Sequence, residues 1–172
     1  MTATTTDHSS YTHTARTVIP GPQRMRVPDD DGWTELIASV KETGQYPTTA
    51  EAERVTRIVL SALGGHVTGD ERVALARALP REAAGVIASQ IPVTRPQSAP
   101  EFVDTIAARI EGATPATARW DVSSVLSVLP KLTGEDLIDR VLAQLPPGYA
   151  LLFGKAELTP AVPSQRIRPG RP

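Results

Sequence analysis

Histidine is the side chain best suited to acid–base and metal chemistry near neutral pH, and this chain has three histidines. His8 and His13 lie in an N-terminal stretch rich in threonine and serine, and we expect His66 to be an exposed residue in a turn after a helix. A Ser-His-Asp triad or a metal site built on His66 would need partners that the local sequence does not supply. Cysteine is absent, which excludes disulfides, thiolate nucleophiles and zinc–thiolate sites.

Glycine-based catalytic motifs are absent too. Neither G-x-S-x-G, the hydrolase nucleophile motif, nor G-x-G-x-x-G, the dinucleotide motif, occurs. The pair Gly154-Lys155 invites comparison with a phosphate-binding P-loop. That motif requires glycine at position 149 and serine or threonine at position 156, where the chain has Tyr149 and Ala156. The sequence therefore predicts no phosphate site there.

Two pairs of carboxylates could in principle share acid–base work: Asp70-Glu71 and Glu135-Asp136. Each pair comes at the start of a predicted helix, where acidic side chains cap the chain and complement the helix dipole. We interpret both pairs as helix starts. We assign no catalytic, cofactor-binding or metal-binding residue, and we expect neither a cofactor nor an enzymatic activity.

Five residues remain as candidates for an interaction site. Tyr149 and Phe153 lie four residues apart in the last predicted helix, so they share one face and either seal the second half of the protein or form a patch for a partner. Arg54, Arg119 and Asp121 interrupt or border apolar stripes. Their placement would fit a small-molecule or active site between two halves of the chain.

Helices are the elements that must position these residues, because apolar residues recur with helical spacing and no strand pattern competes. Capping boxes are predicted where Ser or Thr precedes an acidic residue by three positions, as in Thr48-Glu51, Thr68-Glu71, Ser98-Glu101 and Thr133-Asp136. Trp33, Val73, Phe102 and Trp120 fall within the apolar stripes. The sequence predicts eight helices, over residues 29–44, 48–64, 68–79, 80–90, 98–110, 114–129, 133–142 and 147–154.

An internal repeat emerges when the chain is compared with itself at an offset of 66 residues. Glu35 falls on Glu101, the segment Val59-Leu60-Ser61 on Val125-Leu126-Ser127, and Leu79-Pro80 on Leu145-Pro146. We predict an all-α fold of two four-helix units packed face to face. The first unit would span residues 29–91, a linker 92–98, and the second unit 99–158. The alternative is that the match reflects no repeat, because any two amphipathic helices can be aligned passably.

Both ends of the chain differ in charge from its centre. Residues 29–158 hold 18 acidic and 12 basic residues, a charge of −6, whereas residues 1–28 carry +2 and residues 159–172 carry +3. The two ends lack apolar periodicity and are predicted to be disordered tails. The acidic centre argues against specific nucleic-acid recognition. No segment is predicted to cross or enter a membrane, and no secretory signal is readable, so the cytoplasm is expected.

A family resemblance covers Tyr46 to Leu158. Its recurring features are the segments AEAERVTRIVLSALGGHVTGDE, LARALP, VLSVL and LAQLPPGYALLFG. They resemble the bacterial family known as domain of unknown function 2267. The first Leu-Pro follows Ala78, whereas the second follows Gln144, a small departure. The resemblance implies a helical bacterial protein, and it supplies no activity, cofactor or catalytic residue.

These observations favour a non-enzymatic protein-interaction or regulatory module of the bacterial cytoplasm. Its protein partner would bind in a groove between the two halves or through the tails. The alternative is a small-molecule-binding protein or enzyme with its site between the repeats. A third hypothesis is weak nucleic-acid binding, without sequence preference, through the basic tails.

Overall fold

The computed structural model describes residues 28–155, with side chains from Asp31 onward, and this range contains helices and no strands, as predicted. The predicted disordered tails lie outside the described residues, apart from Pro28, which begins the first helix. Nine helices lie within this range: α1 (Pro28–Gly44), α2 (Thr49–His66), α3 (Gly69–Ala78), α4 (Arg81–Ala88), α5 (Ala99–Ala107), α6 (Pro115–Leu126), α7 (Leu129–Thr133), α8 (Glu135–Gln144) and α9 (Tyr149–Leu152).

The one helix in the described range without a predicted counterpart is the short α7. The predicted sixth helix ran to residue 129, but α6 ends at Leu126 and α7 begins at Leu129, with Pro130 in its first turn. Proline has no N–H to donate to a preceding carbonyl, so it fits the start of a helix and interrupts a longer one. The break redirects the chain from α6 toward α8.

Local capping explains where the helices of the second half begin. The Ser98 hydroxyl accepts from the N–H of Glu101, whose carboxylate accepts from the N–H of Ser98, so the predicted capping box of α5 is confirmed. Thr114 and Thr117 form the same reciprocal pair at α6. In the first half, the Thr48 hydroxyl accepts from the N–H of Glu51 at 3.2 Å.

Two predicted capping boxes are wrong. Thr68 makes no side-chain cap, and its backbone N–H donates to Gln144 of α8, which also donates to Glu71. Thr133 ends α7 and its hydroxyl donates to the Leu129 carbonyl, while Gly134, with a φ of 86°, precedes α8 as its N-cap. At Thr68 a contact from elsewhere in the fold replaces the local cap, and at Thr133 the preceding helix takes the hydroxyl.

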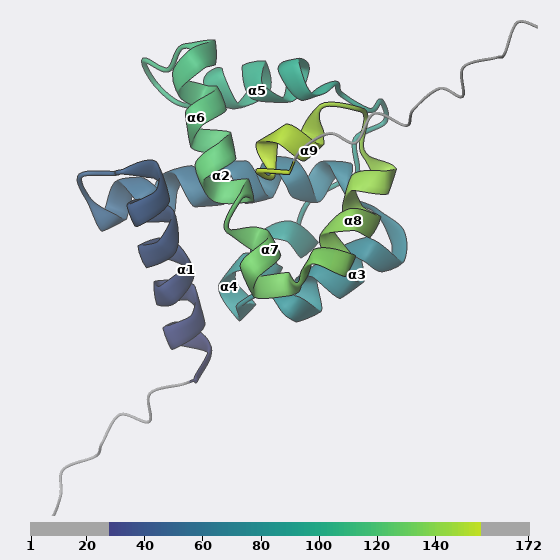
Figure 1. Ribbon diagram of the computed structural model, residues 1–172, viewed down its shortest axis with the longest axis horizontal. Coiled ribbons are helices and arrows are strands. Elements are labelled where there is room, and N and C mark those ends of the chain that lie inside the picture. Colours follow the sequence, from purple (N-terminus) through teal and green to yellow (C-terminus); the bar gives the residue numbers. More distant parts are fainter. Residues whose placement is uncertain (1–27, 156–172) are drawn as a thin grey trace, which may run out of the picture.

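Helix α2 crosses the middle of the molecule, with α6 lying across it (Figure 1). Helices α1 and α4 pack on α2 from the first half, and α5 and α9 pack on α6 from the second half. A Cβ at Gly64 of α2 would lie 2.7 Å from the carbonyl oxygen of Ile87, so glycine permits the close approach of α2 and α4. Helices α3 and α8 meet below this crossing.

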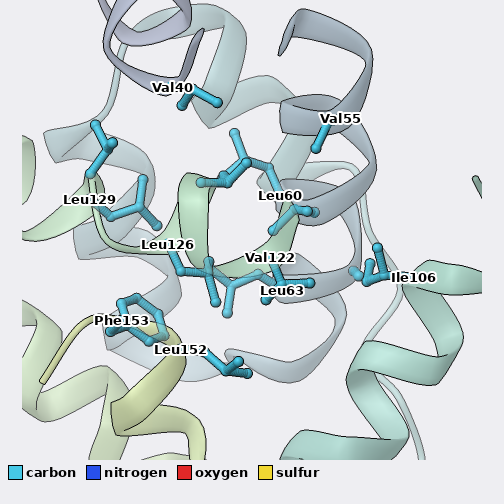
Figure 2. Packing of buried hydrophobic residues seen from close by; sticks show 14 of the residues in the cluster. Val40, Val55, Leu60, Leu63, Ile106, Val122, Leu126, Leu129, Leu152 and Phe153 are labelled. Carbon is cyan, nitrogen blue, oxygen red and sulfur yellow. The ribbon is translucent and has the colours of Figure 1, made fainter. Parts of the chain in front are cut away.

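A single hydrophobic core joins the two halves (Figure 2). Leu60 and Leu63 of α2 and Val122 and Leu126 of α6 are fully buried in it. Val73 of α3, predicted to face the core, is instead 48% exposed because α3 turns only Leu75 fully inward. The removal of this apolar surface from water is the main driving force for the helix packing.

Helix contacts follow a related pattern in the two halves. Helix α1 packs on α2 as α5 packs on α6, while α1 also contacts α6 and α5 contacts α2. The segment 89–98 between the halves contains no helix, and its Val93 N–H donates to the Gly65 carbonyl at 2.8 Å. Such pairing is what two copies facing each other would produce, and the repeat itself stays a prediction.

Val59→Asp is expected to unfold the protein. Val59 is fully buried on α2, so the substitution would bury an unpaired carboxylate at a cost of several kcal/mol, comparable with the whole stability of a domain. The matched control is Ile91→Asp, at a position that is 87% exposed. Circular dichroism should show helix loss only for Val59→Asp. A parent-like thermal transition for that variant would show that the assigned core is wrong.

Candidate functional site

Tyr149 and Phe153, the two aromatic candidates, are both buried. The Tyr149 ring packs against Phe102 with 5.4 Å between centroids, and its hydroxyl donates to the carbonyl of Gln97 at 3.1 Å. Burial raises the pKa of the Tyr149 hydroxyl, so it remains a neutral donor. Of the two alternatives for these rings, the structure therefore places them where they seal the second half.

Asp121, another candidate, is a buried acceptor between the halves. It lies on α6, is 9% exposed, and accepts a hydrogen bond from the Tyr46 hydroxyl at 2.7 Å. Burial raises the pKa of the Asp121 carboxyl, while the Tyr46 hydrogen bond and the charge of Arg54 act to lower that pKa. Asp121 thus binds a residue of its own chain.

The three polar candidates do not form one site. Arg54 on α2 is exposed and acts on Asp121 only through its charge. Arg119 is exposed too, and it lies two residues from Asp121 on α6, a spacing that points side chains to different faces. Around the crossing of α2 and α6, the space between the halves is filled by apolar side chains (Figure 2).

His66 is not the exposed turn residue that the sequence predicted. It is the last residue of α2, it is half-buried, and its ring meets Phe102 edge-on at 5.3 Å. Its Nδ1–H donates to the Ala62 carbonyl at 2.9 Å, and its Nε2 is buried without a hydrogen-bond partner in the described residues. A cavity of about 350 Å³ adjoins His66, but the polar groups of Thr68 and Gln144 in its wall bond to each other. The hydrogen bond between Thr68 and Gln144 thus joins the two halves beside His66.

Trp120 is also placed differently from the prediction. It is 55% exposed, and its indole Nε1–H donates to the carbonyl of Gly44 at 3.1 Å. Ala118 and Val122 occupy the inward face of α6, so Trp120 lies at the rim and covers the end of α1. Trp33 is partly buried and Phe102 fully buried against the core, as expected.

An open apolar pocket lies between the first turns of α5, α6 and α9, and we call it the α9 pocket. It has a volume of about 290 Å³. Leu151, at its edge, is 50% exposed. The rim carries Asp104 and Arg119, both exposed and without an ion pair in the described part of the chain. The apolar wall consists of Ala99, Pro100, Val103, Pro115, Leu151 and Leu152.

Local sequence fixes the walls of the α9 pocket. The capping box at Ser98 holds the first turn of α5, and the pKa of Glu101 falls to about 2 because its carboxylate accepts from the Ser98 backbone N–H, from Arg95 and from the Ser98 hydroxyl. Gly148, with a φ of 96°, turns the chain into α9. A Cβ at Gly148 would lie 3.2 Å from Ala99 Cβ, so glycine brings α9 against α5.

Sequence reasoning found only Arg119 among the residues of this pocket. Val103 and Leu152 follow the same helical spacing as core residues, so nothing local distinguishes a pocket wall from a packed core. A signal was present in the repeat, since Ala99 stands where the first half has Trp33. A small residue opposite a large one can mark a gap in packing.

Fold and pocket together define a small all-helical domain with an open apolar pocket on its surface. The sequence profile of the family described as "Uncharacterized conserved protein (DUF2267)" matches residues 33–152, and the chain belongs to this family. The matched range starts before Tyr46, so α1 is part of the family domain. It also includes every residue of the α9 pocket. No protein of curated function matches the chain.

Two substitutions test, one at a time, the two partners of the buried hydrogen bond between the halves. Tyr46→Phe removes the only hydroxyl that bonds Asp121 in the described residues, so the free energy of unfolding should fall by about 1–3 kcal/mol at pH 7. Asp121→Asn keeps an oxygen acceptor without the charge, and its stability at pH 7 should equal or exceed that of the parent.

The pH dependence of these variants has a definite sign. Burial raises the pKa of Asp121 in the folded protein above its ordinary value of 3.8. The folded protein therefore holds the Asp121 proton more tightly than the unfolded chain does, and it loses stability as the pH rises from 3.8 through the folded pKa. The advantage of Asp121→Asn should therefore be absent at low pH and develop toward pH 7 in urea unfolding. A Tyr46→Phe protein as stable as the parent would contradict this assignment.

Proposed function

We propose that this protein is a non-enzymatic protein-interaction module that binds a segment of a partner in the α9 pocket. The observation that carries the proposal is an open apolar depression with the half-exposed Leu151 at its edge. Exposed apolar surface around a concave site is typical of binding sites in folded proteins.

The size of the pocket favours a protein partner. A volume of about 290 Å³ lies at the lower end of the range for small-molecule sites, which enclose most of their ligand. It suits one large side chain, and protein interfaces often gain much of their affinity from such an anchor. The charges of Asp104 and Arg119 at the rim would orient the partner backbone and its flanking residues.

The location of this pocket changes the sequence hypothesis about the partner surface. A groove between the two halves was expected, whereas the α9 pocket is formed by three helices of the second half. The alternative of a small-molecule or active site between the halves is less supported at Asp121, because Asp121 is bonded to Tyr46 there. Binding through the tails concerns residues outside the described range.

The proposed cellular location is the cytoplasm. Among the described helices, none combines the length and hydropathy that crossing a bilayer requires. Within the same residues, no three His, Asp or Glu side chains are grouped in a way that could hold a metal ion. The absence of cysteine fits a reducing compartment.

Peptide display on the full chain tests the proposal. We expect the selection to enrich peptides that bind the parent and lose about tenfold or more of their affinity for Leu151→Asp, which places a charge at the pocket edge. Leu132→Asp, the same change at an exposed leucine on α7, is the matched control and should bind like the parent. Enriched peptides that bind both variants equally well, or no enrichment, would contradict the proposed function.

A further inference from the structure

In the first half of the protein, Trp33 fills the space where α1, α2 and α4 meet. Trp33 of α1 packs against the core, and the guanidinium of Arg57 lies over its ring, 4.9 Å from the centroid. Arg57 also forms ion pairs with Glu53 at 2.9 Å and with Glu82 of α4 at 2.8 Å. An indole therefore occupies the meeting point of α1, α2 and α4, and charged side chains cover it.

The predicted repeat sets different residues of the second half against these positions. With the offset of 66 residues, Ala99 replaces Trp33, Arg119 replaces Glu53, and Gly148 replaces Glu82. All three replacements line the α9 pocket. The corner that holds an indole and its ionic cover in the first half is thus open in the second half.

We propose that the α9 pocket binds a tryptophan side chain of a partner protein, an inference that rests on the proposed function above. The apolar body of the indole would pack on Val103 and Leu152. Arg119 would stack on its face as Arg57 does on Trp33, and Asp104 would accept the indole N–H.

The two charges on the rim distinguish tryptophan from other apolar side chains. Leucine would fill the pocket without engaging either Asp104 or Arg119, and phenylalanine has no N–H for the carboxylate. An indole offers an aromatic face to the cation and a donor to the anion. Trp120 of this chain likewise bonds its N–H, in that case to the Gly44 carbonyl.

The chain itself offers no obvious occupant of this kind. Its two tryptophans are Trp33, which is packed in the first half, and Trp120, whose N–H is already bonded. Residues 156–172 contain no aromatic side chain, and residues 1–27 contain only Tyr11. A separate partner protein is therefore the occupant to test.

The direct test is an NMR titration of the 15N-labelled full chain with N-acetyl-L-tryptophanamide, and with the leucine and phenylalanine analogues. We expect saturable shifts at Gly148, Leu151 and Arg119, with an affinity about threefold to tenfold higher for the tryptophan compound. Asp104→Asn and Arg119→Gln should each reduce this preference while leaving the affinity for the leucine compound unchanged. Equal affinities for all three compounds would overturn the inference.

Two blocking variants and a size measurement complete the test. Ala99→Trp should fill the pocket from within and abolish the shifts, and Leu151→Asp should do so even if Ala99→Trp fails to fold. Analytical sedimentation should give the same molecular mass per particle for the parent and for Leu151→Asp. A dimer that Leu151→Asp dissociates would assign the pocket to a second copy and overturn the inference.

The inference and the proposed function can fail separately. Displayed peptides that depend on Leu151 but carry no tryptophan would overturn the tryptophan inference alone and leave the binding function standing. A selection without any pocket-dependent peptide would overturn the proposed function itself.

Discussion

Helices α2 and α6, one from each half, cross and bury apolar side chains in one shared core. Val59, Leu60 and Leu63 of α2 and Val122 of α6 are fully buried in the shared core. Thr56 is buried there as well, with its hydroxyl bonded to the Ala52 carbonyl at 2.7 Å, so it leaves no unsatisfied donor. The positions of the other helices follow from which side of this crossing they cover.

This constraint also explains why a pocket can persist in a small domain. Phe102, Leu152 and Phe153 lie buried beneath the first turns of α5 and α9, and these two turns meet where Gly148 approaches Ala99. With only the methyl group of Ala99 at this point, the space between the helices stays open. Under the predicted repeat, Trp33 fills the corresponding corner of the first half, whereas the α9 pocket of the second half is open.

Much of the fold could be predicted from the sequence because its signals are local. The Ser98-Glu101 box and the apolar spacing of α2 and α5 involve residues within one or two turns. Thr68 and Trp120 were predicted wrongly because their partners, Gln144 and Gly44, lie 76 residues away in the chain. The pocket was missed for another reason. Its wall residues have the same spacing as core residues, and only the predicted repeat, which sets Ala99 against Trp33, points to it.

The shared core is tested most directly by separating the halves. Residues 28–96 and 97–155 can be produced as two chains and followed by circular dichroism during thermal unfolding, alone and mixed, beside the full chain. If α2 and α6 need each other, each half alone should be largely unfolded and without a cooperative transition, and mixing should restore helix and cooperativity. Two halves that each unfold cooperatively near the transition of the full chain would contradict a core held in common.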